Sequence, residues 1–190
     1  MAFLHSKLVI VGDISPCNFV LRAEVQYSGD AADHSLSCCG VGEGNTACFC
    51  DCGSATLLRE QDVMADAEEG ADSTVPQVNG DKLQVAVGTP LFAAPELWHG
   101  GKASQRSDMW SVGACMFAII FGFPPFAGAD MASLKQKIEA ARPIYPTIPE
   151  DHPEAAEYQR ARSVISQLLC KDPLSRIDVV RAKAHPFFGT

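Results

Sequence analysis

In the second half of the chain, apolar side chains recur with the period of an α-helix. Four stretches carry this pattern: residues 107–121, 131–141, 155–170 and 179–184. In the second stretch, Leu134 and Ile138 fall on one face and charged side chains lie elsewhere, which is typical of an amphipathic helix. The inner stripe of the third stretch consists of Ala161, Val164, Ile165, Leu168 and Leu169. Polar starts and Gly or Pro stops bound these stretches, so the pattern predicts a helical second half.

The first half has a different pattern, with short strands between loops. The apolar runs at residues 8–11 and 19–21 have the composition of β-strands, and residues 2–7 are typical of the last turn of a helix. Residues 24–46 and 63–81 are polar with little periodicity, which is typical of surface loops. So few strands cannot form a large sheet. We therefore expect an α+β fold that is mainly helical.

The size and charge of the chain limit the classes of partner. Its 190 residues are enough for one domain with a core of its own. Lys and Arg number 15 against 23 Asp and Glu, which gives a net charge of −8. A surface that binds nucleic acid needs clustered basic side chains, so we expect no nucleic-acid partner. A basic peptide is compatible with this charge.

The N-terminus lacks the charged start and apolar run of a signal peptide. The most apolar stretch, residues 112–121, is far shorter than the ~20 residues that a membrane span needs. We therefore expect no membrane partner and a location in the cytoplasm, with the nucleus as the alternative.

Eight cysteines are present, and five of them crowd into residues 38–52. In a reducing compartment they stay thiols. The alternation of Cys48, Cys50 and Cys52 raises zinc binding as one interpretation, but the C-x-x-C spacing that closes two thiolates on one metal is missing. The favoured interpretation is a cysteine-rich insertion at residues 24–47, and a zinc site is the alternative.

Asp13 and Asn18 stand five residues apart, between the two apolar runs. This is the spacing of a kinase catalytic loop, in which the Asp orients the substrate hydroxyl or accepts its proton and the Asn holds magnesium. Because an Asp and an Asn fall at this spacing often by chance, a simple turn around Pro16 is the alternative.

Asp51 and Gly53 form a second candidate site. A carboxylate at the end of a strand can hold a second metal position, and a glycine after it lets the backbone turn sharply. The alternative is again a turn without chemistry.

Residues 88–96 are the most specific segment of the chain. They end in Ala-Pro-Glu and resemble the segment that closes the activation loop of kinases. A buried Glu96 needs a cationic partner, and Arg176 stands at the position that supplies it in kinases. Asp108 matches the kinase residue that caps backbone amides of the catalytic loop.

In their order and content, these segments resemble the eukaryotic protein kinase family, in particular the C-terminal lobe of a serine/threonine kinase. The resemblance runs from Leu4 to Phe188. It implies a protein-kinase-like fold with a mainly helical lobe, a short β-hairpin at the active site and an activation segment at residues 51–96. Residues 101–110, 121–126 and 133–138 are similar to the calcium/calmodulin-dependent kinase kinase group.

The resemblance also implies ligands and roles. It implies ATP and Mg²⁺ as cofactors, a protein substrate, and an upstream regulator of unknown identity. Asp13 would be catalytic, and Asn18 and Asp51 would hold magnesium. The positions that would frame the site and its substrate shelf are Gly53, Thr89, Glu96, Asp108 and Arg176.

Several positions depart from the family pattern. Val11 and Gly12 replace the usual His-Arg, so we expect control by activation-loop phosphorylation to be weak or absent. Ser15, in the nucleotide site, replaces the Lys that contacts the transferring phosphate. Cys52 replaces the Phe of the Asp-Phe-Gly triplet. A slower kinase and a pseudokinase that acts as a binding module are both compatible with these changes.

The sequence ahead of Asp13 holds no Gly-rich phosphate loop and no Val-Ala-x-Lys strand. We therefore expect the N-terminal lobe to be absent, and half of the ATP pocket with it, so that this chain alone binds ATP poorly. A truncated gene model is the favoured explanation, and a functional half-kinase is the other.

Overall fold

The structure is a computed structural model, and it describes residues 1–22, 46–58 and 89–189. Its helices are α1 (Ala2–Ser6), α3 (Gln105–Phe121), α4 (Met131–Ala140), α5 (Ala155–Leu168) and α6 (Val179–Lys183). Its strands are β1 (Val9–Ile10), β2 (Phe19–Arg22), β3 (Thr46–Phe49) and β4 (Thr56–Leu57). Short 3-10 helices are η1 (Pro16–Asn18), η3 (Pro90–Phe92), η4 (Pro95–His99) and η5 (Pro186–Phe188). Helices therefore dominate the described part.

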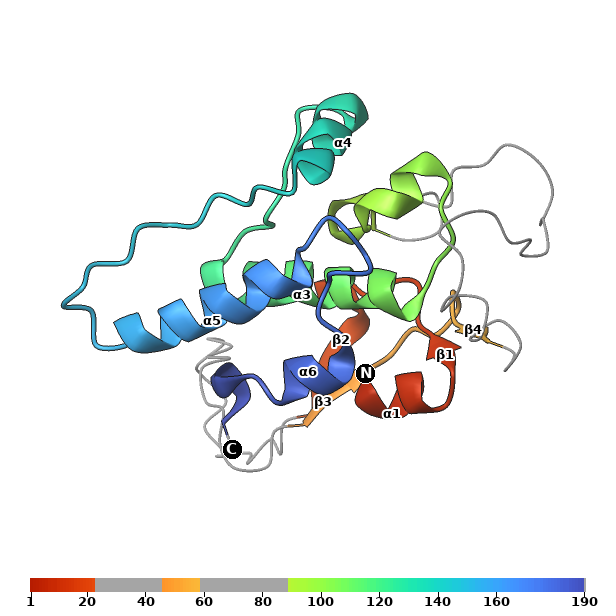
Figure 1. The fold of residues 1–190 in the computed structure, drawn as a ribbon, viewed down its shortest axis with the longest axis horizontal. Helices are drawn as coiled ribbons and strands as arrows, with labels where there is room; N and C mark the ends of the chain where they lie inside the picture. Colours follow the sequence, from red (N-terminus) through yellow and green to blue (C-terminus); the bar gives the residue numbers. More distant parts are fainter. Residues whose placement is uncertain (23–45, 59–88, 190) are drawn as a thin grey trace, which may run out of the picture.

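Helix α3 runs through the middle of the molecule, and α5 packs along it (Figure 1). Trp110 and Phe117 of α3 are fully buried. Gly113 permits the close crossing of the two helices, because a Cβ at that position would lie 2.6 Å from the Cβ of Leu168. The predicted inner stripe of α5 is confirmed, since all its members are buried: Ala161, Val164, Ile165, Leu168 and Leu169.

Capping groups set the helix ends within a few residues of the predicted positions. α3 begins at Gln105, ahead of predicted residue 107, because the Ser104 hydroxyl accepts the Ser107 N–H in a capping box. α4 ends at Ala140 because Ala141 has a left-handed backbone with φ 48°. In the described ranges, no helix combines the length and apolar character that crossing a membrane requires.

The strands form two antiparallel pairs, β1 with β4 and β2 with β3. Of the apolar run at residues 8–11, only Val9–Ile10 is a strand, because Leu8 and Gly12 on either side have positive φ angles. The prediction of a loop over residues 24–46 was wrong at its end, since Thr46 pairs with Arg22 in the β2–β3 ladder. The proposed insertion up to residue 45, and residues 59–88 of the proposed activation segment, lie outside the described residues.

Helix α4 lies at the edge of the molecule, and the extended segment 141–154 connects it to α5 (Figure 1). It packs against η4. There, the His99 Nε2 atom lies 3.0 Å from Glu139 Oε1 of α4. The η4 segment, which carries the Pro and Glu of the Ala-Pro-Glu triplet, is therefore packed against α4.

Candidate active site

The loop that carries Asp13 is fastened to helix α3 through Asp108. The Asp108 carboxylate accepts the Val11 N–H at 2.8 Å on Oδ2 and the Gly12 N–H at 2.9 Å on Oδ1. It is 2% exposed, so burial is offset by these charge-assisted hydrogen bonds. Helix α3 thereby fixes the backbone immediately before Asp13.

A third residue that contacts the Asp108 carboxylate comes from α1, and the sequence analysis did not identify it. His5 Nε2 lies 3.0 Å from Asp108 Oδ2, and both side chains are buried. The His5 carbonyl oxygen also accepts a hydrogen bond from Gln105 Nε2 at 2.8 Å. The first turn of α3 therefore holds α1 twice, through the side chain and the backbone of one histidine.

Asp13 itself is partly buried and is held from two sides. Its Oδ1 atom accepts the Thr89 N–H at 3.1 Å, from a residue 76 positions later in the chain. Its backbone carbonyl accepts Asn18 Nδ2 at 2.9 Å, which closes the short loop through η1. The structure thus brings Asp13, Asn18 and Thr89 together.

Asp51 lies two residues after the end of β3, and strand pairing places it near Asn18. The Cys50 N–H donates to the Asn18 carbonyl at 2.9 Å, which extends the β2–β3 ladder to the residue before Asp51. Asp51 is exposed, and its Oδ1 atom accepts the Gly53 N–H at 2.8 Å. A tight turn after the strand therefore fixes the orientation of the Asp51 carboxylate.

Asn18 and Asp51 fit the chemistry of magnesium. An amide oxygen and a carboxylate are the hard oxygen ligands that Mg²⁺ takes from proteins, with water and phosphate oxygens filling the other positions. In the described residues, no three His, Cys, Asp or Glu side chains gather into a larger metal site. This donor set is too small for a structural zinc site and sufficient for magnesium bound with a nucleotide.

Glu96 of η4 is paired with Arg176, which stands in the loop between α5 and α6. Two bonds join them, from Arg176 Nη1 to Glu96 Oε1 at 2.8 Å and from Nη2 to Oε2 at 3.0 Å. The Arg176 Nε atom donates to the Cys170 carbonyl at 2.9 Å, and its guanidinium lies 5.2 Å from the Trp110 ring centre. This bidentate pair connects the Ala-Pro-Glu segment to the helical core.

The segment between Thr89 and Glu96 is also fastened to α3. The Ser111 hydroxyl donates to the Phe92 carbonyl at 2.8 Å, and both residues are buried. Sequence reasoning missed Ser111, because a serine inside an apolar helix gives no indication of its distant acceptor. Residues 89–99 therefore form a shelf on α3 beside Asp13.

This arrangement can be compared with known proteins. Residues 1–188 match the sequence profile described as the protein kinase domain. The chain belongs to the protein kinase family. The match covers the Asp13 loop, the shelf and the Glu96–Arg176 pair in one stretch.

Relatives that are named as protein kinases are similar to this kinase domain. The serine/threonine-protein kinase cek1 of Schizosaccharomyces pombe is 36% identical over 113 residues, which is 58% of this chain and 8% of the relative. The 3-phosphoinositide-dependent protein kinase 1 of Caenorhabditis elegans is 27% identical over 99% of this chain and 28% of its own length. The serine/threonine-protein kinase ssp1 of S. pombe is 28% identical over 98% of this chain and 24% of its own length. The chain thus spans less than a third of each of these relatives.

Position 12 is a glycine where kinases usually have an arginine, and the structure explains why. Gly12 has φ 82°, and a Cβ there would lie 2.9 Å from the Ser54 carbonyl oxygen. A side chain would be strained both by the backbone angle and by this contact. In this kinase domain, Gly12 therefore fits a backbone angle and a close contact with Ser54 that a larger residue would strain.

Ser15 takes the place of the kinase lysine, and the structure buries it. Ser15 is 1% exposed, and its hydroxyl oxygen has no hydrogen-bond partner within the described residues. A buried hydroxyl without a partner costs about 1–3 kcal/mol. Ser15 thus lies under the loop rather than at its surface, and it offers neither the length nor the charge of a lysine.

The thiols around the site differ in exposure. Cys17, Cys50 and Cys52 are exposed next to the proposed magnesium positions, whereas Cys115 of α3 is buried beneath the loop. Burial, and then the nearby charge of Asp13, raises the pKa of the Cys115 thiol to about 12. The Cys115 Sγ atom lies 3.5 Å from the Ile14 carbonyl oxygen. It is a packing residue, while the exposed thiols are accessible to reagents.

Proposed function

We propose that this chain forms the substrate-facing part of a protein serine/threonine kinase, which transfers the γ-phosphate of ATP to a hydroxyl of a protein. The observation that carries the proposal is the double fixing of Asp13. Asp108 holds the backbone before it, and the Thr89 N–H holds its carboxylate at 3.1 Å. A carboxylate positioned by two separate segments is preorganised to orient an attacking hydroxyl.

Each residue of the site has a defined part in this reaction. Asp13 orients the substrate hydroxyl and takes its proton, while the Thr89 N–H keeps Oδ1 in place and leaves Oδ2 for the hydroxyl. Asn18 and Asp51 would hold Mg²⁺, which when bound neutralises charge on the phosphate oxygens. The shelf at residues 89–99 supports the peptide that carries the hydroxyl.

Finer assignments follow from the same resemblance. Residues 101–110 and 121–126 support placement near the calcium/calmodulin-dependent kinase kinase group. ATP, a protein substrate and an upstream regulator are the expected partners, and the cytoplasm is the proposed location. The net charge of −8 is compatible with a basic peptide substrate.

The test is phosphate transfer from labelled ATP to a peptide containing Ser and Thr. The protein is expressed from the complete transcript that encodes this chain. Asp13→Asn should abolish transfer, because the amide can no longer accept the proton. Asp151→Asn is the matched control, since Asp151 is an exposed acid on the 141–154 segment, and it should leave transfer unchanged. Full transfer by the Asp13→Asn protein would refute the assignment.

A second candidate function is a pseudokinase that binds a protein partner without transfer. The observation in its favour is Ser15, which lies buried where a kinase has a lysine at the transferring phosphate. Sequencing the transcript upstream of Met1 and then measuring phosphate transfer by the complete protein separates the two functions. If a Gly-rich loop and a Val-Ala-x-Lys strand precede this chain in frame and the complete protein still transfers no phosphate, the pseudokinase function stands.

A further inference from the structure

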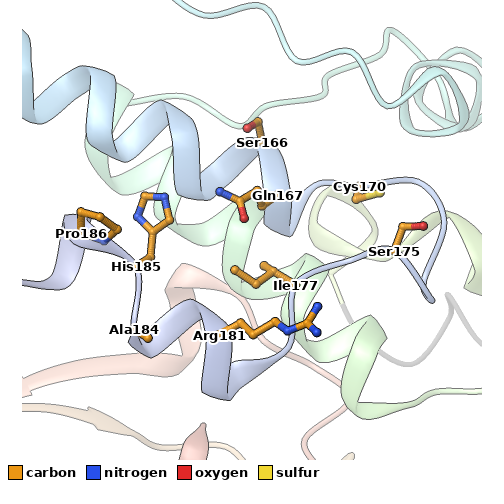
Figure 2. Close-up of a pocket in the computed structure, with 9 residues that line it drawn as sticks. All are labelled: Ser166, Gln167, Cys170, Ser175, Ile177, Arg181, Ala184, His185 and Pro186. Atoms are coloured by element: carbon orange, nitrogen blue, oxygen red, sulfur yellow. The ribbon is translucent and has the colours of Figure 1, made fainter.

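A concave site away from the proposed kinase residues lies between α5 and α6. It is a pocket of about 520 Å³, within the range of ~300–1,000 Å³ that is usual for small-molecule sites. Figure 2 shows its walls: Gln167 from α5, Ser175 and Ile177 from the loop after α5, and Arg181 and His185 from α6 and its end. None of the proposed kinase residues lines it.

The walls of this pocket are held in place by the fold. The Ile177 N–H donates to the Gln167 carbonyl at 3.3 Å, which ties the loop to α5. Asp178 caps α6 by accepting the Arg181 N–H at 2.8 Å. His185 accepts the Phe187 N–H on Nδ1 and lies 3.2 Å from the Ser163 hydroxyl through Nε2. The backbone segments that carry the pocket walls are therefore fixed by hydrogen bonds.

The charge around the pocket differs from that of the whole chain. The chain carries a net charge of −8, but residues 154–190 hold six Lys or Arg against four Asp or Glu. No Asp or Glu is among the described residues that line the pocket. Among the described lining residues, Arg181 is the one cation and no carboxylate offsets it, on a chain whose net charge repels anions.

Arg181 is the donor that this pocket leaves free. Its side chain is 80% exposed, and its nearest carboxylate is Asp178, 4.0 Å from Nε. In the described residues the Arg181 Nη atoms have no acceptor, whereas the hydroxyls of Ser166 and Ser175 already donate to Ser163 O and Asp172 Oδ2. Gln167 Nε2 has one weak acceptor at 3.3 Å, which leaves its other hydrogen available.

We propose that this pocket binds a phosphate group, with the Arg181 guanidinium as its main contact and the Gln167 amide as a second donor. A guanidinium fork matches phosphate oxygens in a bidentate manner. The pocket is larger than a phosphate ion, and Ile177, Ala184 and Pro186 give it an apolar wall. The phosphate is therefore carried by a small organic group, such as a phosphorylated amino acid side chain or metabolite.

Cys170 provides a direct probe, because its half-buried thiol lines the pocket. The folded protein, expressed from the complete transcript that encodes this chain, is labelled with N-ethylmaleimide, and the rate at each cysteine is followed by mass spectrometry. O-phosphoserine should slow labelling of Cys170 and leave that of the exposed Cys17 and Cys50 unchanged. Inorganic phosphate is the second arm: protection by both means that the phosphate alone suffices, and protection by O-phosphoserine alone means that the organic group is required. Serine without phosphate should have no effect.

Two arginine variants decide whether the contact is the one proposed. Arg181→Gln should weaken O-phosphoserine binding about tenfold or more, because a charge-assisted hydrogen bond is lost. Arg160→Gln is the matched control, since Arg160 is an exposed arginine of α5 that lies outside the pocket, and protection should persist. The proposal is overturned if phosphate compounds leave the Cys170 rate unchanged, or if protection is equal in the Arg181→Gln and wild-type proteins.

Discussion

Arg106 and Arg176 each donate a hydrogen bond from Nη1 to the backbone carbonyl oxygen of the other. These two cations can lie side by side because each has its own carboxylate. Glu96 pairs with Arg176 at 2.8 Å, and Asp178 lies 3.7 Å from Arg106. The start of α3, the Ala-Pro-Glu segment and the loop before α6 are therefore joined at one junction.

Removal of Arg176 should be among the most destabilising single changes in this domain. Its side chain is fully buried, and Glu96 is 18% exposed, so Arg176→Met leaves a largely buried carboxylate without a partner. The expected loss in free energy of unfolding is about 3–5 kcal/mol. Urea unfolding followed by circular dichroism measures it.

Two comparisons make this prediction specific. Arg181→Met removes an exposed arginine whose only carboxylate neighbour in the described residues is 4.0 Å away, and it should cost at most about 1 kcal/mol. Combining Arg176→Met with Glu96→Leu removes both charges and should recover part of the loss. If the double variant is as unstable as the sum of the two single variants, the unpaired carboxylate is not the cause.

Gly12→Ala should destabilise the loop that carries Asp13. The alanine would hold φ 82° and bring its Cβ to 2.9 Å from the Ser54 carbonyl oxygen. The expected cost is about 1–3 kcal/mol, from strain at one residue. Gly122→Ala is the matched control: φ is 81°, and within the described residues no atom lies within 4 Å of the added Cβ. The difference in unfolding free energy between the two variants therefore isolates the contact with Ser54, and equal losses would contradict that contact.

Asp108→Asn tests the anchor of the loop that carries Asp13. The carboxylate accepts the Val11 and Gly12 N–H groups on different oxygens, but an amide has a single acceptor oxygen. One buried N–H then faces an NH₂ group, and we expect a loss of about 2–4 kcal/mol from the lost charge-assisted bond and the unpaired donor. Hydrogen exchange of these two amides is the direct measurement. Asp172→Asn, an exposed acid in the α5–α6 loop, should leave their exchange unchanged.

Much of this fold could be predicted because its helices repeat their apolar positions locally. The stripe of α5 and the amphipathic α4 follow from spacing alone, and short motifs indicated Asp13, Glu96 and Asp108. The helix caps could be predicted less well. The capping box of Ser104 and Ser107 starts α3 earlier than its apolar pattern does.

What the sequence did not indicate depends on contacts between distant residues. His5 is one histidine in a short helix, and only its bond to Asp108, 103 residues away, makes it structural. Strand β4 has two exposed residues and exists because it pairs with β1. The burial of Ser15 likewise depends on the packing of the loop on α3, and no local pattern expresses it.

Cys115 should not react with thiol reagents near neutral pH, whereas the exposed cysteines should react. Burial raises its thiol pKa to about 12 from 9.0, so the native thiol stays protonated and shielded. N-ethylmaleimide at pH 8 should label the exposed Cys17, Cys50 and Cys52, and label Cys115 only in urea. Labelling of Cys115 at the rate of Cys17 in the native protein would contradict its burial.

Because the pKa of Cys115 is raised in the folded protein, the unfolding free energy should fall at alkaline pH. Below about pH 9 the thiol of Cys115 is neutral in both the folded and the unfolded chain, so its contribution to stability is fully present. Between pH 9 and 12 the unfolded chain ionises first, and the unfolding free energy falls. Cys115→Ser removes this titration, so the variant should lose less stability than the wild type over that interval. Identical slopes of unfolding free energy against pH would mean that Cys115 does not titrate in this way.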